Sequence, residues 1–460
     1  MKRILSIILV ALMITALTAC GGSTSEEGPQ APEDGISRLS PWTTQDDVVL
    51  TPVFSATIDE VVLADEKDVK VTAKELTYTE DTADLVLSVE NNTDKKIRFK
   101  TYVGDDDSLV SVNQYMMSIW NDDPVEAGAQ ADITITFNKS RLLLCGITDI
   151  ASIGISFVIK QGDEEYLSVD PAEIETSVSK SYKDKTMFRD AISSKSFLEE
   201  NKSAIDFGSD APLIDYLDMK ALNGIVITDS SSTRGLILEV INNSEETRCV
   251  SLADPSVNGL AFSTSVNEVA IFPGKRALIG AAFSSLESEE MEMLGMTKYG
   301  SYACTYTVKD LDGEVLGTKE MQVIIDDTET HASYTGETLY DNNDVTIQYV
   351  SSEVEGSIWY SVDVTLFVTN NSDQKIKVTN KNDEVYVNDT QIPAATDAYV
   401  LRPGECGFFT TSIQGPTLET YDLLPEKIKE ISTMFVIEDE NGKIIDRQEI
   451  AITYGDENES

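Results

Sequence analysis

The sequence predicts an all-β fold built from three tandem copies of one β-sandwich module. Two observations support this prediction. A turn sequence with two asparagines recurs as VENNTDKKI, VINNSEETRC and VTNNSDQKI, and each copy ends a run in which apolar and polar residues alternate. Alternation at period 2 is typical of strands with one face in a core, and self-similarity at wide spacing indicates repeated structural units.

Further landmarks keep a constant order in all three copies. Each asparagine turn is followed by a Val-Asn pair, then by a glycine turn, and then by a frame that aligns without a gap. The Val-Asn pairs lie at 112–113, 257–258 and 387–388, the glycines are Gly128, Gly274 and Gly404, and the frames align Phe157, Tyr306 and Phe435. This order predicts that the three aromatic residues occupy one structural position.

The asparagine pairs predict turns at the ends of core strands. They are Asn91-Asn92, Asn242-Asn243 and Asn370-Asn371. Asparagine tolerates left-handed φ, and its side chain can bond to the nearby backbone. The same letters spell N-glycosylation sequons, but the bacterial lipid-attachment signal described below favours the turn.

Local signals predict the connections as well. The pairs Asp312-Gly313 and Asn441-Gly442 predict two-residue type I′ hairpins, and the sequence QGDEE in the first copy predicts a looser turn. Apolar residues every three positions after Gly146, and at its counterparts, predict a helical or 3₁₀ turn before the next strand. Residues 181–202 have apolar residues at roughly helical spacing and predict a short helix.

The first residues predict secretion and lipid attachment. Lys2 and Arg3 precede an apolar core from Ile4 to Leu17, as in a secretory signal, and the stretch LTAC resembles the bacterial lipobox. This resemblance implies that Cys20 receives acyl chains such as palmitate, which anchor the protein on the extracytoplasmic face of the cell membrane. Residues 20–50 are rich in Gly, Ser, Glu and Pro and predict a flexible tether.

About seven short strands per copy, with hairpins and regular turns, predict sandwiches of immunoglobulin-like type. The pattern resembles the immunoglobulin-like modules of lipoproteins from Gram-positive bacteria, and the resemblance rests on structural turns and implies no catalytic residue. The predicted order is a signal peptide at 1–19, the tether at 20–50, a first module at 51–178, a linker at 179–204, a second module at 205–328, a linker at 329–334, a third module at 335–455 and an acidic tail at 456–460.

The net charge and the few reactive side chains exclude some classes of partner and of active site. The formal net charge of −45 argues against nucleic acid and anionic membrane surfaces as partners, because both would repel the chain. Cys145 and Cys304 are expected to be buried thiols, a Cys249–Cys304 bridge stays open, and Cys406 is expected to be the accessible thiol. The sequence has a single histidine, His331, so a multi-histidine zinc site is excluded. His331 is expected at the surface of a linker.

Three acidic turns are candidate calcium sites, since calcium takes six to eight oxygen ligands. Solvated turns are the simpler interpretation, because the full calcium-loop signature with its distant glutamate is missing, and no cofactor is required. The three tryptophans stand at non-equivalent places and predict no repeated platform for glycans. The candidate ligands are Asp105, Asp106, Asp107, Asp310, Asp312, Asp341 and Asp344, and the tryptophans are Trp42, Trp120 and Trp359.

The sequence therefore predicts a non-catalytic extracytoplasmic lipoprotein. It would present its modules to a surface protein or a glycan, or act as a spacer in the envelope. Two alternatives stay open: a carboxylate-dependent surface enzyme or its accessory subunit, and a calcium-stiffened adhesin stalk. The enzyme would need a concave pocket with convergent acids and shifted pKa values, whereas the stalk would lose thermal stability in EDTA.

Overall fold

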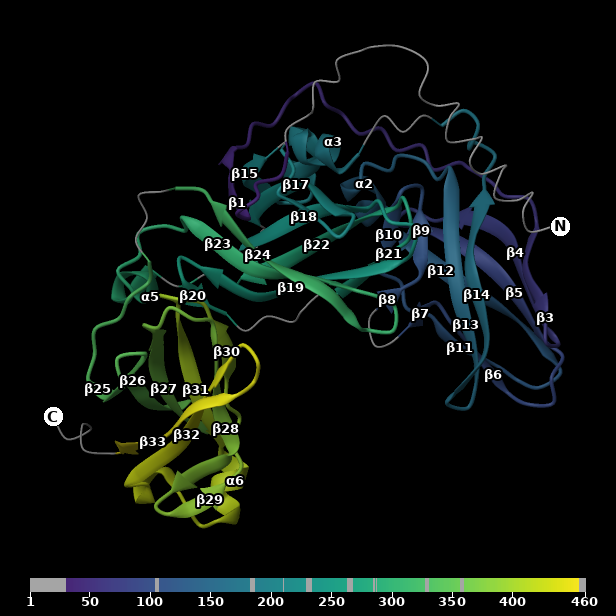
Figure 1. Cartoon of the computed structure of the whole chain (residues 1–460). Helices are drawn as coiled ribbons and strands as arrows, with labels where there is room; N and C mark the ends of the chain where they lie inside the picture. The colour runs from purple at the N-terminus through teal and green to yellow at the C-terminus, as the bar shows by residue number, and fades with distance from the viewer. Residues whose placement is uncertain are drawn as a thin grey trace, which may run out of the picture. The chain divides into compact units, whose positions relative to one another are not determined.

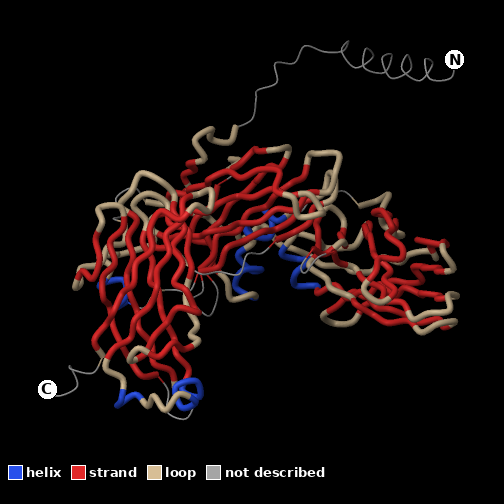
Figure 2. The backbone as a smooth tube through the Cα atoms, turned by 60° about the horizontal axis from the view of Figure 1, so that its bottom comes forward, coloured by secondary structure: helices blue, strands red, loops and turns tan. Residues whose placement is uncertain are grey.

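The all-β prediction is confirmed. The computed structural model describes residues 30–103, 107–182, 187–209, 211–228, 234–262, 268–283, 286, 288–326, 331–355 and 360–454. Strands make up most of this part of the chain, and its helices are short (Figure 2). The signal peptide, Cys20 and the acidic tail lie outside the described residues.

The first module is a sandwich of two sheets around one core. Leu85, Leu87 and Val89 alternate along one strand with less buried residues and are fully buried, as the period-2 pattern requires. One sheet contains β12 (Ala129–Asn138), β5 (Thr82–Asn91), β4 (Val69–Tyr78) and β3 (Val61–Glu66). The facing sheet contains β11 (Asp122–Val125), β6 (Ile97–Lys100), β13 (Ser152–Gln161), β14 (Glu164–Glu175), β9 (Val110–Val112) and β10 (Tyr115–Met117), beside a small ribbon of β7 (Tyr102–Val103) and β8 (Asp107–Ser108).

The second module repeats this plan around its own core. Its first sheet contains β22 (Arg276–Phe283), β18 (Arg234–Asn242), β17 (Met219–Thr228), β16 (Ile214–Tyr216) and β15 (Ala204–Ser209). Its second sheet contains β24 (Val315–Ile324), β23 (Ser301–Lys309), β19 (Arg248–Val257), β20 (Leu260–Ala261) and β21 (Glu268–Ile271).

The third module follows the same plan, with a third core. Its first sheet contains β31 (Cys406–Gln414), β27 (Ser361–Asn370), β26 (Val345–Glu355) and β25 (Thr338–Asp341). Its second sheet contains β29 (Thr390–Ile392), β28 (Ile376–Val387), β30 (Ala398–Leu401), β32 (Glu430–Asp439) and β33 (Ile444–Thr453). Phe157 on β13, Tyr306 on β23 and Phe435 on β32 are each 0% exposed, one in the core of each module.

The sheets do not end at the module boundaries (Figure 1). The second sheet of the first module continues into the first sheet of the second module through a parallel pairing of β10 with β22. The second sheet of the second module continues into the first sheet of the third through a parallel pairing of β20 with β31. We call these the first and the second junction. Both use the same two strand positions of the module.

The N-terminal segment corrects the predicted tether. β1 (Ile36–Arg38) pairs in parallel with β24, and β2 (Ser40–Pro41) pairs with β15, so part of residues 20–50 is ordered. Leu39 is buried in the second module's core, and the Trp42 indole donates a hydrogen bond of 3.0 Å to the Ile192 carbonyl. The composition did not indicate this ordered segment, because a few well-spaced apolar residues are enough to cover the open edge of a sheet.

The hairpin predictions were wrong. The two loops predicted to be two-residue type I′ turns are longer, and the loop predicted to be looser is a two-residue turn. Gly313 and Gly442 have positive φ, but Asp312 and Asn441 do not, so these loops are not type I′ turns. Each has a hydrogen bond from its glycine N–H to the residue three positions earlier and a register shift in the ladder, as in a type I turn followed by a glycine bulge. In the first module, Gly162 and Asp163 alone join the strands, because Gly162 supplies the positive φ of a tight turn.

The linker helix is confirmed as a pair, α3 (Phe188–Ser193) and α4 (Lys195–Glu200). The sequence predicts a helical turn after Gly146 and after its counterparts. Each module instead has a short helix just before that position. These helices are α2 (Lys139–Leu144), α5 (Ser288–Met293) and α6 (Gly415–Thr420). A 3₁₀ turn at the expected place is present in the third module, at Pro425–Lys427. The Asn138 side chain caps α2 by accepting from the Ser140 N–H, a start signal that precedes Gly146.

Candidate functional site

The three asparagine turns share one set of hydrogen bonds. Asn91, Asn242 and Asn370 are all 0% exposed and end β5, β18 and β27. Each side-chain amide donates to the carbonyl four residues later and to a carbonyl from a distant strand end, such as Leu401 at 2.9 Å. Each Oδ1 accepts from the Ser or Thr two residues later. These side chains close the modules and are unavailable to an outside ligand.

The Val-Asn turns are equally regular. Asn113, Asn258 and Asn388 have φ of 52°, 48° and 47°. In each, Oδ1 accepts from two consecutive backbone N–H groups at the start of β13, β23 or β32, and Nδ2 donates to a nearby carbonyl. Each turn therefore fixes the short strand that follows it, which is β10, β20 or β29.

The calcium candidates do not converge. Oδ1 of Asp310 accepts from the N–H groups of Asp312 and Glu314, and Oδ1 of Asp341 accepts from Asn343, so these carboxylates stabilise turns. No group of three His, Cys, Asp or Glu side chains in the described ranges is placed to hold a metal ion. Asp105 and Asp106 lie outside these ranges, Asp107 belongs to β8, and Asp344 follows the Asp341 turn.

The expectation that Cys406 is an accessible thiol was wrong. Cys145, Cys249, Cys304 and Cys406 are all buried free thiols, so the bridge is not formed and Cys406 is not the accessible one. Burial raises the pKa of the Cys406 thiol to about 12, with a smaller contribution from Glu405. The sequence of the third module could not show this, because the Cys406 thiol contacts the Gly259 and Ala332 carbonyls, which lie outside that module. His331 is exposed.

Of the tryptophans, Trp42 anchors the N-terminal segment and Trp120 is 54% exposed, whereas Trp359 lies outside the described residues.

The second junction is held by backbone and side chain together. The Cys406 N–H donates to the Gly259 carbonyl at 2.8 Å, which starts the parallel pairing of β20 with β31. A small apolar cluster fills the space beside it, and it includes Leu260, Leu294 and Phe367. The Phe367 ring lies 5.2 Å from that of Phe408 in an edge-on arrangement.

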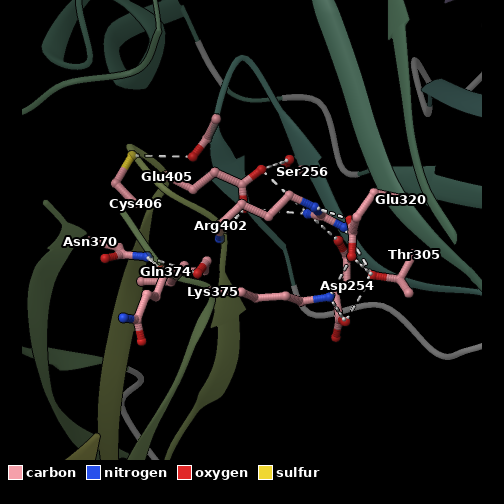
Figure 3. A network of polar contacts seen from close by, with 12 residues as sticks. Asp254, Ser256, Thr305, Glu320, Asn370, Gln374, Lys375, Arg402, Glu405 and Cys406 are labelled. Carbon is pink, nitrogen blue, oxygen red and sulfur yellow. Dashed lines mark hydrogen bonds and ion pairs between the residues drawn. The ribbon is translucent and has the colours of Figure 1, made fainter. Parts of the chain in front are cut away.

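A charged network crosses this junction (Figure 3). Arg402, from the glycine turn of the third module, donates to Glu320 of the second module at 2.5 Å and lies 3.3 Å from Glu405. Glu405 is 4% exposed, and it accepts from the Ser256 hydroxyl across the junction at 2.6 Å. Because the Arg402 side chain is itself only 14% exposed, the charge of Glu405 is neutralised in a buried position.

Lys375 extends the network from the neighbouring asparagine turn. Its ammonium donates to Glu320 at 2.6 Å and to the Thr305 hydroxyl at 3.0 Å, and it lies 3.7 Å from Asp254. Burial disfavours the charged Glu320 carboxylate, but Arg402 and Lys375 outweigh this and hold its pKa below the usual range. The network thus joins three strands of the second module to two turns of the third.

The first junction uses different chemistry at the same positions. The Arg276 N–H donates to the Gln114 carbonyl at 2.7 Å, the counterpart of the Cys406 bond. Glu239, 0% exposed, accepts from the Tyr115 hydroxyl at 2.5 Å and from the Arg276 guanidinium at 3.0 Å. Lys275 reaches the Asn113 carbonyl at 2.7 Å across the same junction. The first junction therefore also encloses a neutralised carboxylate.

One repeat position explains the difference between the modules. The residue three places before the buried asparagine is Ser88, Glu239 or Phe367. Glu239 and Phe367 lie in the two junctions, whereas Ser88 accepts from Gln130 within the first module at 2.6 Å. Sequence comparison of the repeats could have found this position, because residues that support one module stay alike while residues that touch a neighbour diverge.

A cavity of about 420 Å³ opens beside the first junction. It is lined by α2, by the linker helices and by strands of the second module, including β17 and β22. The lining is mainly apolar, with Cys145 in it, and burial raises the pKa of that thiol to about 12. The sequence does not predict this cavity, because its walls come from segments far apart in the chain.

In the part of the chain that the structure describes, no helix is both long and apolar enough to cross a membrane.

Comparisons with known proteins add no function. No protein-family model matches the chain, and no curated protein is significantly similar to it. Among solved structures, the exo-chitosanase CsxA of Amycolatopsis orientalis matches 48% of this chain at 11% identity and a TM-score of 0.18, and the chain covers 25% of that enzyme. A DUF4785 family protein from Legionella pneumophila matches 90% of this chain and 96% of its own length, at 9% identity and a TM-score of 0.15. TM-scores this low support no conclusion about the chain.

Proposed function

We propose that this protein is a non-catalytic extracytoplasmic lipoprotein whose three immunoglobulin-like modules form a rigid spacer that presents a surface to a protein or glycan partner. The observation that carries the proposal is the continuity of the sheets through both junctions. The lipobox-like stretch ending at Cys20 supports the membrane anchor.

Rigidity follows from the number of independent contacts at each junction. At the second junction, a backbone pairing, a buried carboxylate with its cation, and apolar contacts would all have to break before the third module could turn on the second. The first junction likewise has a backbone pairing and a buried carboxylate with its cation. Residues from Ala31 onward accordingly group into one compact unit rather than three. Interfaces between domains of one chain are often loose, so this degree of connection favours a mechanical role.

The roles of the buried acids support a non-catalytic function. Glu239 and Glu405 are each neutralised by an arginine and accept hydrogen bonds from a neighbouring module. A general acid or base needs access to a substrate proton, which a carboxylate inside a module junction does not have.

A distance measurement tests the spacer. Spin labels on Thr134→Cys and Asn382→Cys, two exposed positions in the first and third modules, would report the distance between them. The four native thiols are buried and should not react with the label. A raised pKa also keeps Cys145, Cys304 and Cys406 protonated. The proposal predicts one narrow distance distribution in residues 31–460, whereas a broad distribution would contradict the spacer.

The anchor needs its own test. Labelled palmitate should enter the full-length chain in bacteria, and Cys20→Ala should abolish the label and release the protein from the membrane fraction. Labelling that persists in Cys20→Ala would show that the lipobox assignment is wrong.

A further inference from the structure

We propose that the cavity beside the first junction binds a single-chain amphipathic carboxylate, such as a medium-chain fatty acid. Its volume of about 420 Å³ lies within the range of small-molecule sites, which bury an apolar ligand body and orient it with a few polar groups. Such sites are common where domains meet, and this one lies where α2 of the first module faces the second module.

The interior of the cavity suits an alkyl chain. Six of its lining residues are apolar and buried, and four further apolar lining residues are half-buried. The buried set is Met116, Cys145, Ile192, Phe197, Leu198 and Ile205. The half-buried set is Leu144, Ile227, Val269 and Leu278. Half-buried apolar side chains in a concave wall gain free energy when an apolar ligand removes them from water.

The edge of the cavity carries the polar groups. Ser140, Arg141 and Asn201 are exposed, and the other two polar lining residues, Ser118 and Ser203, are half-buried. None of the polar lining residues is buried, whereas six of the apolar ones are. Arg141 donates to the Ser118 hydroxyl at 2.8 Å, which orients the guanidinium beside the opening. It forms no ion pair with any acid in the described ranges, so its remaining donors can meet a ligand.

The charge of the lining selects the head group. The chain has a formal net charge of −45, yet no acid is among the described residues that line this cavity, and Arg141 is their one charged member. A guanidinium matches the two oxygens of a carboxylate with parallel hydrogen bonds. Arg141 therefore fits the carboxylate of the ligand, and the apolar interior of the cavity fits its single alkyl chain. This site is independent of the proposed spacer and can exist whether or not the modules serve that role.

Calorimetric titration of residues 31–460 with decanoate, below its micelle concentration, tests the proposal. Binding should strengthen about fourfold per added methylene from hexanoate to decanoate, the factor that corresponds to roughly 0.8 kcal/mol. Acetate should not bind, and decan-1-ol should bind more weakly than decanoate because it lacks the charge. Vesicles of phosphatidylcholine should not bind, since the cavity admits a single chain.

Two variants and a control locate the site. Arg141→Gln should weaken decanoate binding about tenfold and leave decan-1-ol unchanged, and Leu144→Trp should abolish binding of both by filling the cavity. Arg98→Gln, at another exposed arginine of the first module, should change neither. Failure of decanoate to bind the wild-type protein overturns the proposal, and so does binding that both cavity variants retain. Equal loss of acid and alcohol in Arg141→Gln would overturn the carboxylate assignment.

Discussion

Replacing Arg402 with alanine should release the third module from the second without unfolding either. In the folded protein, Arg402 bonds to Glu320 of the second module and neutralises Glu405, which is 4% exposed. Removing one partner of a buried pair costs about 3–5 kcal/mol, because the other charge is left uncompensated. Glu405 would keep the Ser256 hydroxyl and one backbone N–H, so we expect a loss of about 3 kcal/mol.

The assay is urea unfolding followed by the fluorescence of a probe in each module. The wild-type second and third modules should unfold together, and in Arg402→Ala the junction should open first. Arg447→Ala should cost less than about 1 kcal/mol, because half-exposed Arg447 forms its ion pair with Glu384 within the third module.

A double-mutant cycle separates the buried charge from the lost contacts. Arg402→Ala combined with Glu405→Gln should cost clearly less than the two single losses added together, because the neutral amide leaves no orphan charge. Additive losses, or a loss below about 1 kcal/mol for Arg402→Ala alone, would refute the reasoning.

Four further predictions follow from the same structure. The pKa of Glu320 is lowered in the fold, so its contribution is fully present above its ordinary value of 4.5 and is lost as the pH falls through the lower folded value; Glu320→Gln should flatten this acid-side loss in melting curves. Asn370→Ala should cost about 2 kcal/mol in urea unfolding because buried carbonyls lose their donor, whereas exposed Asn371→Ala should cost less than about 0.5 kcal/mol. Trp42→Ala should free the N-terminal segment, seen as faster protease cleavage within residues 31–45; an unchanged rate would show that Trp42 does not anchor it. EDTA should leave the melting temperature unchanged, because candidate carboxylates such as Asp310 already accept backbone N–H groups; a lower melting temperature would favour the calcium-stiffened stalk.

The sequence predicted the features that depend on neighbours along the chain. Alternation placed Leu85 and Leu87 in a core, and the repeated asparagine turns marked the ends of β5, β18 and β27. These predictions succeed because the three modules repeat the same local structure. A pattern that recurs in all three copies can be told from one that occurs in a single copy by chance.

Features that depend on contact between modules could not be predicted in this way. Cys406 reads as exposed when the third module is considered alone, and it is buried because β20 of the second module pairs beside it. The N-terminal segment reads as a tether by composition, yet Leu39 fills a place in the second core. Local patterns carry no information about which open sheet edge a distant strand will meet.

The most direct test of the account is hydrogen exchange at the backbone amides of Arg276 and Cys406, the donors that carry each sheet into the next module. Continuous sheets predict that both amides exchange as slowly as amides in the interior of β18 and β27. Exchange as fast as that of an exposed loop, with the strand interiors still protected, would show that the modules are joined flexibly and would contradict the account.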